Sequence, residues 1–225
     1  LPEKLRPLLG LGGDTLVDGF RRRFLPTPPP PPAAPGTGGT PDISVVIPTH
    51  DVEDYLDELL DSVRAAAGPR LEIIVVDDHS SDTTWQILER HARQDARLRL
   101  LRSPVRGGGA ARNTGVAAAT GEWLCFADGD DIVPPDAYAS MLDTARRTDA
   151  EIVSASYEKF GDTWRWDGGT LFGYDLELDA VEPAQHPRLL THRVCWNRLI
   201  RRDFWLANQL SIPREEAGAY IRKYF

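Results

Sequence analysis

Residues 124–131 read LCFADGDD, an apolar stretch that runs directly into three carboxylates. Apolar residues of this kind predict a buried strand, which would normally end in a turn rather than in Asp128, Asp130 and Asp131 together. Carboxylates this close repel one another unless a positive group joins them. A divalent cation such as Mg²⁺ or Mn²⁺ would do so and could then hold the phosphates of a nucleotide. The alternative is a helix start, because Asp is a good N-cap and Pro134 follows.

Strands and helices alternate on both sides of this stretch. Continuous apolar runs predict strands at 43–47, 71–76, 98–101, 123–127 and 152–155. Apolar residues at helical spacing predict helices at 54–67, 110–119 and 136–147, and one more that Ser81 or Asp82 caps. This order predicts an α/β fold, with a mostly parallel central sheet and helices on both faces.

Ligands of such sheets bind beyond the carboxyl ends of the strands. Three predicted strands end in polar or acidic residues, namely Pro48-Thr49-His50, Asp77-Asp78 and Asp128–Asp131. We therefore expect these ends to converge in one crevice, with the two acidic ends beside each other. An acidic residue after a second strand commonly accepts hydrogen bonds from a ribose. The alternative for residues 79–82 is a plain polar turn before a helix.

Residues 106–115, RGGGAARNTG, form a glycine-rich loop that leads into a helix. Its free N–H groups and Arg112 could face phosphates, or its small residues could simply let a helix pack closely on the sheet. No glycine-rich turn follows the first strand, which argues against ordinary dinucleotide binding and against a P-loop NTPase.

Composition excludes several classes of protein. The formal net charge of -8 argues against non-specific binding to nucleic acid. No apolar run is long enough to span a membrane, and the start of the sequence does not resemble a signal peptide. Cys125 and Cys195 are the only cysteines, and Cys125 is expected to be a small buried hydrophobe. These features favour a cytoplasmic protein, and a first residue other than Met suggests a fragment or a processed chain.

The flanking segments differ from the regular part. Residues 26–41 are rich in Pro and Gly and predict a linker. Residues 1–25 could form an amphipathic leader that docks on a partner or an anionic membrane. The alternative, which we favour, is a disordered tail or the end of a preceding domain. The aromatic residues of 158–192 could stack on sugar rings or form a small separate core.

Four ordered stretches together resemble family 2 glycosyltransferases, which have the GT-A fold. They are SVVIPTH at 44–50, IVVDDHSSD at 74–82, GAARNTG at 109–115 and FADGDD at 126–131, and CWNRLIRR at 195–202 is a weaker match. The resemblance implies transfer of a sugar, usually from a UDP-sugar, with inversion at the anomeric carbon. It makes 42–157 the nucleotide-sugar-binding half and 158–225 an acceptor-side segment.

The resemblance also implies roles for individual residues. It gives nucleotide contacts to Pro48, Thr49, His50, Asp77, Asp78, Gly109, Arg112 and Asp128. Asp130, with Asp128, would hold Mn²⁺ or Mg²⁺, and Asp131 would lie at the sugar or beside the metal. A carboxylate base would then deprotonate the acceptor hydroxyl.

The sequence departs from the family at the position of that base. Family members usually carry a Glu-Asp pair near the end of this domain, whereas Ile221-Arg222 follow Tyr220 here. Glu215 or Glu216 could substitute, and Asp131 is a further candidate for a catalytic role. A truncated or diverged C-terminus, in a chain that is part of a longer protein, would explain the difference.

Our leading hypothesis is a metal-dependent inverting glycosyltransferase of cell-surface polysaccharide, teichoic-acid-like polymer or glycolipid synthesis. Its acceptor would be a carbohydrate, a polyol phosphate or a lipid-linked molecule, reached from the inner face of the membrane. The alternative is a nucleotide-sugar-binding module of a larger protein that lacks its own catalytic base. A sugar nucleotidyltransferase is disfavoured, because it would need a glycine-rich loop directly after the first strand.

Overall fold

The computed structural model describes residues 39–161, 164–167, 181, 194–213 and 222–223. The predicted leader at 1–25, most of the linker, much of 158–192 and both Glu215 and Glu216 lie outside these residues.

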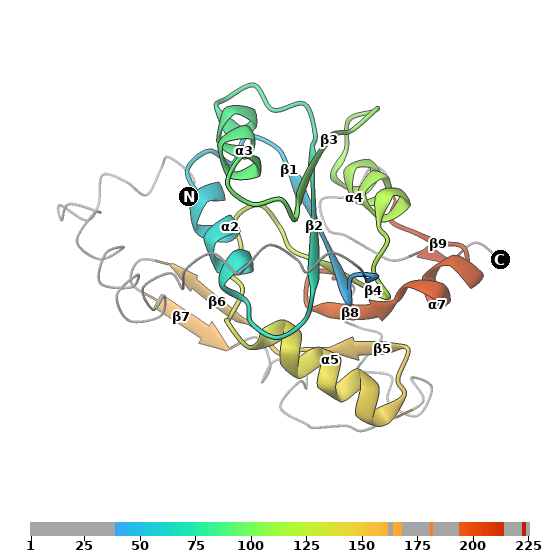
Figure 1. Cartoon of the computed structure of the whole chain (residues 1–225). Helices are drawn as coiled ribbons and strands as arrows, with labels where there is room; N and C mark the ends of the chain where they lie inside the picture. Colours follow the sequence, from blue (N-terminus) through green and yellow to red (C-terminus); the bar gives the residue numbers. More distant parts are fainter. Residues whose placement is uncertain (1–38, 162–163, 168–180, 182–193, 214–221, 224–225) are drawn as a thin grey trace.

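A mixed six-stranded sheet forms the centre of the fold, in the order β3-β2-β1-β4-β8-β5 (Figure 1). The strands are β1 Ile43–Thr49, β2 Leu71–Asp77, β3 Leu98–Arg102, β4 Trp123–Phe126, β5 Ile152–Ser154 and β8 Arg198–Arg201. Strands β1 to β4 run parallel, whereas β8 is antiparallel to both β4 and β5. The carboxyl ends of β1, β2 and β4 therefore share one edge of the sheet.

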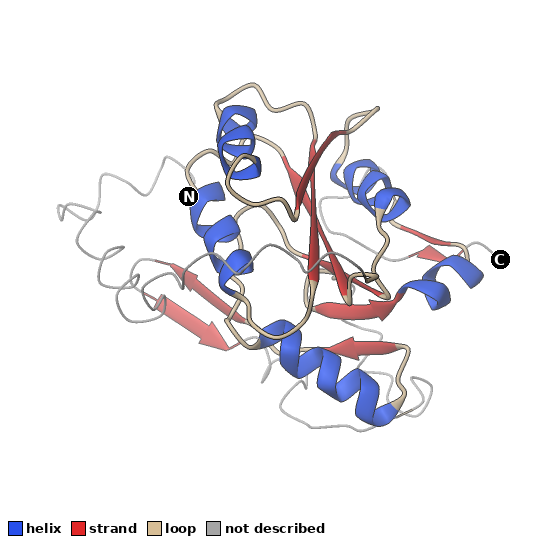
Figure 2. Ribbon diagram, in the orientation of Figure 1, coloured by secondary structure: helices blue, strands red, loops and turns tan. Residues whose placement is uncertain are grey.

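Helices cover both faces of the sheet (Figure 2). Their bounds are α2 Leu56–Ala65, α3 Thr84–Ala92, α4 Gly108–Ala118, α5 Ala137–Thr148 and α7 Arg202–Ala207. Helices α2, α3 and α5 contribute to one buried core, and α4 and α7 contribute to the other. The predicted α/β architecture is confirmed.

Alternate residues of each inner strand pack into one or the other of these two cores. In β1, Val45 and Ile47 belong to the core under α2 and α5, whereas Val46 belongs to the core under α4. Burial on both faces explains why the strands read as continuous apolar runs instead of alternating patterns. Helix α4 approaches closely, because a Cβ added to Gly115 would lie 2.4 Å from Val46 Cγ1.

Several elements differ from the expectation. Strand β8, from the weakly matching segment, inserts between β4 and β5, and Ile200 lies opposite Leu124. Short ladders join β6 Glu158–Gly161 with β7 Trp164–Asp167, and β9 Leu210–Ser211 with β10 Arg222–Lys223. Helix α3 has Thr83 as its N-cap residue, and the Asp82 carboxylate accepts the N–H of Thr84 at 2.9 Å. Of the two predicted caps, Asp82 therefore supplies a side-chain bond to the first turn, although the N-cap position itself falls at Thr83.

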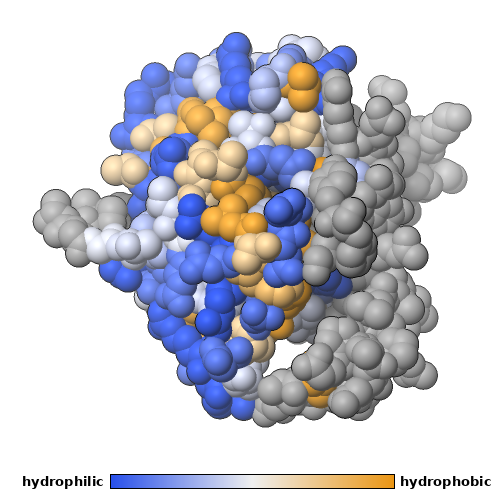
Figure 3. All heavy atoms as spheres, turned by 90° about the vertical axis from the view of Figure 1, so that its right-hand side faces the viewer, coloured by the Kyte–Doolittle hydropathy of each residue, from blue (hydrophilic) through white to orange (hydrophobic). Residues whose placement is uncertain are grey.

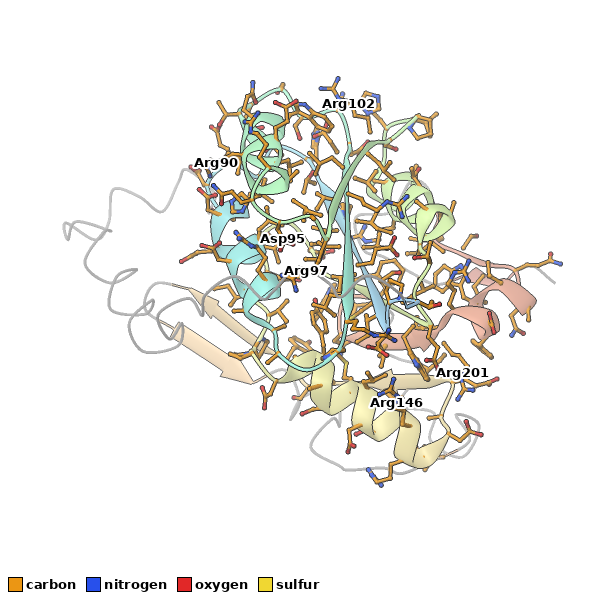
Figure 4. The ribbon with its side chains drawn as sticks, viewed as in Figure 1. Arg90, Asp95, Arg97, Arg102, Arg146 and Arg201 are labelled. Atoms are coloured by element: carbon orange, nitrogen blue, oxygen red, sulfur yellow. The ribbon has the colours of Figure 1, made fainter. Side chains whose placement is uncertain are left out.

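Charged side chains mark the two edges of the sheet (Figure 4). At the edge opposite the acidic strand ends, Arg97 donates to Asp95 at 2.7 Å and Arg201 to Asp149 at 2.6 Å. Arg102, at the carboxyl end of β3, lies 4.2 Å from the centroid of the Trp85 ring. Among the described residues, no helix combines the length and the apolar character that crossing a membrane requires.

Candidate functional site

The acidic ends of β2 and β4 lie on the same edge of the sheet but are not neighbours. Strand β1 separates them, since it pairs with β2 on one side and with β4 on the other. The expectation that Asp77-Asp78 and Asp128–Asp131 lie side by side was therefore wrong. What joins the two ends is a third element, helix α4.

Hydrogen bonds between two loops shape the β1–β2 side of this edge. The Asp51 carboxylate accepts the N–H of Ser81 at 2.7 Å, and the Asp51 N–H donates to Ser80 Oγ at 3.1 Å. The N–H of Val52 donates to the hydroxyl of Thr84 at 3.0 Å. Asp51 has a φ of 49°, a left-handed conformation that a non-glycine residue keeps only when its surroundings stabilise it. These bonds preorganise both loops.

His50 lies at the end of β1 and contacts Asp78. Its Nδ1 is 2.8 Å from the Asp78 carbonyl oxygen. A carbonyl oxygen only accepts, so Nδ1 carries the proton and Nε2 is left facing the Asp51 carboxylate, 3.6 Å away. Pro48 and Thr49 are buried in β1, so His50 is the exposed member of the three predicted nucleotide contacts.

Asp78 is held by the start of α4. Its two carboxylate oxygens accept the N–H of Gly107 at 3.0 and 2.8 Å. Gly107 has a φ of 126°, which only glycine adopts readily. Gly109, which the sequence pointed to, is buried within α4, and the loop residue that contacts Asp78 is Gly107. Asp77 is buried and accepts the N–H of Ser80 at 3.3 Å, a turn-forming role.

The same helix contacts the other acidic end. Arg112 of α4 donates through Nη2 to Oδ1 of Asp128. The Arg112 side chain is 11% exposed and that of Asp128 is 31% exposed, so the pair is partly shielded from water. Helix α4 and the loop before it therefore bind Asp78 and Asp128 at once, which defines the candidate site.

A tight turn holds the carboxylates after β4. The N–H of Asp128 donates to Oδ2 of Asp131 at 3.0 Å, and the N–H of Asp131 donates to the Asp128 carbonyl at 3.1 Å. Burial and then the charge of Asp128 raise the pKa of Asp131 to about 7, against the lowering effect of its hydrogen bond. Asp130 is exposed. The turn thus brings three carboxylates together, and Arg112 pairs with one of them, Asp128.

The turn fits a hard cation in part. Within the described ranges, no three His, Cys, Asp or Glu side chains are grouped as a ready metal site. Asp130 offers carboxylate oxygens, which Mg²⁺ and Mn²⁺ prefer, while Asp128 is already engaged by Arg112. Further ligands would have to come from nucleotide phosphates and water. The charges of Asp128 and Asp130 add to burial in raising the pKa of Asp131, so a cation bound at this turn would oppose that rise.

Sequence reasoning missed three residues near the site. Gly107 holds Asp78, Asn113 of α4 hydrogen-bonds the backbone of Ile212, and the buried hydroxyl of Tyr138 has no partner among the described residues. Burial, then the charges of Cys125 and Asp131, raise the pKa of Tyr138. A glycine run and an Arg-Asn pair are visible in the sequence, but which atoms they reach depends on the fold.

The two cysteines take no part in the chemistry of the site. Cys125 and Cys195 are buried, and burial raises the pKa of each thiol to about 12. Cys125 is the small buried hydrophobe that the sequence predicted. Neither thiol has the thiolate character of a nucleophile.

Comparisons of the sequence identify relatives of the chain. The model of glycosyl transferase family 2 matches residues 44–205. The chain is 33% identical over 192 residues to the putative glycosyltransferase EpsH of Bacillus subtilis (strain 168), covering 83% of this chain and 54% of EpsH. It is 32% identical over 115 residues to the poly(ribitol-phosphate) beta-glucosyltransferase of Bacillus spizizenii (strain ATCC 23059 / NRRL B-14472 / W23), covering 49% and 18%. The chain spans about half the length of EpsH and less of the other relative.

Solved structures share the fold. Residues 1–349 of S. aureus TarS match with a TM-score of 0.67 and 25% identity, over 77% of this chain and 51% of that one. The mannosyltransferase PcManGT of Pyrobaculum calidifontis, in complex with GDP-Man and Mn²⁺, matches with a TM-score of 0.56 and 21% identity, over 92% and 57%. Together with the sheet and helix arrangement, these matches confirm the predicted GT-A fold.

Proposed function

Because the chain belongs to glycosyltransferase family 2, we propose that it carries the donor-binding half of an enzyme that transfers a sugar from a UDP-sugar to a hydroxyl acceptor. A TarS structure similar to this chain contains UDP-GlcNAc, and PcManGT contains GDP-Man, which supports a nucleotide-sugar donor. The chain spans about half of TarS residues 1–349, so the complete activity belongs to the proposal as well.

One observation carries the proposal. The loop and helix at Gly107 and Arg112 bind Asp78 and Asp128, which lie on opposite sides of β1. A nucleotide lying across the end of β1 would meet His50 and Asp78 on one side and the Asp128–Asp131 turn on the other. We propose that the first pair contacts the base and ribose, and that Arg112 and the turn lie at the diphosphate.

Asp130, with Asp128, would hold Mg²⁺ or Mn²⁺. When bound, such a cation neutralises the charge that develops on the departing diphosphate. The chain itself contributes the exposed carboxylate of Asp130 and the fixed turn around it. Arg112 balances the charge of Asp128 in the metal-free protein.

Inversion needs a base on the face of the sugar opposite the leaving group. Asp131 is one candidate for this base from the sequence, and it lies in the turn after β4, where its Oδ2 accepts the N–H of Asp128 at 3.0 Å. Glu215 and Glu216 are the other candidates from the sequence, and both lie outside the described residues. We propose that one of these three carboxylates takes the proton of the acceptor hydroxyl.

The names of two relatives support a proposal for the acceptor class. They include the succinoglycan biosynthesis protein ExoO of Rhizobium meliloti (strain 1021) and the poly(ribitol-phosphate) beta-glucosyltransferase. We propose that this chain serves the synthesis of a cell-surface polysaccharide, a teichoic-acid-like polymer or a glycolipid. It would work in the cytoplasm, at the inner face of the membrane.

A second candidate is a nucleotide-sugar-binding module without turnover of its own. Ile221-Arg222 stand where the family usually has its acidic pair, which favours this view. Both candidates predict nucleotide binding. Formation of a glycosylated product by the full chain would eliminate the second.

Calorimetry of the full chain with UDP, UDP-GlcNAc and GDP-mannose, with and without Mn²⁺, tests the proposal. We expect UDP to bind at least tenfold more tightly with Mn²⁺, and Asp130→Ala to abolish that difference. Asp136→Ala is the matched control, because Asp136 is an exposed aspartate nearby whose side chain makes no capping bond. Metal-independent UDP binding that survives Asp130→Ala would show that the site assignment is wrong.

A further inference from the structure

Asn113 makes two hydrogen bonds to the backbone of a single distant residue. Its Nδ2 donates to the carbonyl of Ile212 at 2.8 Å, and its Oδ1 accepts the N–H of Ile212 at 2.9 Å, across 99 positions in the sequence. Only one orientation of the amide satisfies both bonds, because a flipped amide would set donor against donor and acceptor against acceptor. The Asn113 amide therefore bonds both the N–H and the carbonyl of Ile212, as the backbone of a neighbouring strand would.

The surroundings of this contact are apolar. Ile212 is 2% exposed and belongs to the core that α4 and α7 cover. The face that bears α4, α7 and β9 shows apolar residues gathered at its surface (Figure 3). Apolar packing is not directional, so it lets one segment slide along another, whereas two paired hydrogen bonds fix the position. Asn113 thus sets where the end of β9 lies along α4.

The position of Asn113 links this contact to the candidate site. The preceding residue of α4, Arg112, pairs with Asp128. Consecutive helix residues point about 100° apart, so the two side chains reach different partners from the same turn. One turn of α4 therefore holds both the acidic end of β4 and the end of β9.

We propose that Asn113 is a positioning residue for the transfer step. It fixes the backbone at Ile212 from the same turn of α4 that bears Arg112, and it does not itself contact the nucleotide. This inference rests on the proposed function, and it assigns to Asn113 the placement of the end of β9 against the turn of α4 that carries Arg112.

Asparagine is suited to this role and its nearest substitutes are not. Aspartate would still accept the N–H of Ile212 but would set a second oxygen against the Ile212 carbonyl. Alanine would remove both bonds while favouring the helix, since alanine has the higher helix propensity. If the backbone at Ile212 shifts in Asn113→Ala, a weakened α4 would therefore not be the cause.

Hydrogen exchange of the Ile212 amide tests the contact directly. We expect exchange at Ile212 to become about tenfold faster in Asn113→Ala and also faster in Asn113→Asp. Asn208→Ala is the matched control, because Asn208 bonds only locally, to the carbonyl of Phe204 at 2.9 Å. It should leave the Ile212 amide protected. Unchanged exchange in both Asn113 variants would overturn the inference.

Kinetics separate positioning from plain stability. For Asn113→Ala we expect the affinity for UDP with Mn²⁺ and the KM for UDP-GlcNAc to stay within twofold, while kcat for UDP release, with water taking the sugar, falls at least tenfold. A variant with fast exchange at Ile212 and an unchanged kcat would also overturn the inference. Failure of the wild-type chain to bind any of the three nucleotides would instead refute the proposed function, and the exchange experiment would still decide what Asn113 holds.

Discussion

The guanidinium of Arg112 and the carboxylate of Asp128 form an ion pair that closes helix α4 onto the end of β4. Asp128 precedes Asp130 and Asp131 in the same turn, so Arg112 offsets part of the negative charge of this cluster in the metal-free protein. The arrangement makes the site depend on α4 as much as on the strands that carry the acids.

Arg112→Met should destabilise the metal-free protein. Removing one partner leaves Asp128 beside two further carboxylates, and we expect a loss of about 1–2 kcal/mol in the free energy of unfolding. Addition of Mn²⁺ with UDP should restore part of it. Urea denaturation in EDTA and then in Mn²⁺ with UDP measures both effects. Arg93→Met, at an exposed arginine beyond α3, is the control. Equal stability of the two variants in EDTA would contradict the prediction.

Stability of the metal-free protein should depend on Asp131 between about pH 4 and 7. The folded-state pKa of about 7 lies above the ordinary 3.8, so the native protein binds more protons than the unfolded chain in this range. The stabilising contribution of Asp131 is therefore fully present below about pH 4 and is lost as pH rises toward 7. Above pH 7 the free energy of unfolding no longer changes because of this group. The loss is up to about 4 kcal/mol.

Denaturation curves in EDTA across this pH range, for wild type and Asp131→Asn, measure that dependence. The Asn variant should lack the decline and should be the more stable protein at pH 7. Asp42, whose pKa hydrogen bonds from Arg70 lower to about 2, acts in the opposite sense and below pH 4, so the two effects separate. Parallel pH profiles for the two proteins would count against the raised pKa of Asp131.

Gly115→Ala should separate α4 from the sheet. The added methyl group would lie 2.4 Å from Val46 Cγ1, and overpacking of this kind costs about 1–3 kcal/mol. Val46→Ala removes the clashing group, so the double variant should lose less stability than the two single variants combined. Thermal and urea denaturation of all four proteins completes the cycle. Strict additivity would show that the two side chains do not meet.

Thr84→Val should loosen the two loops of the nucleotide side. The buried Thr84 hydroxyl accepts the N–H of Val52, and valine keeps the shape while leaving that N–H without its partner, at about 1–2 kcal/mol. Thr84→Ser keeps the hydroxyl and serves as the control. UDP affinity should fall together with stability in Thr84→Val. A variant as stable as wild type would mean that the bond contributes nothing.

Much of the fold was predictable from the sequence, because strands that are buried on both faces have continuous apolar sequences. The apolar runs that became β1, β2 and β4, and the helical spacing of α2 and α5, matched the structure to within a few residues. Strand β8 escaped prediction, because its pairing between β4 and β5 joins residues far apart in the chain. The order of apolar and polar residues within β8 does not indicate which strands it pairs with.

The sequence by itself determined the alternating α/β order, the family, and which carboxylates end the strands, since these depend on neighbouring residues and their burial. Only the tertiary structure decided which groups meet. It placed β1 between Asp78 and Asp128, gave Gly107 rather than Gly109 to Asp78, and paired Asn113 with Ile212. The physical reason is that a hydrogen bond or ion pair depends on distance and direction in space, which strand order and helix rotation fix only when the whole chain has packed.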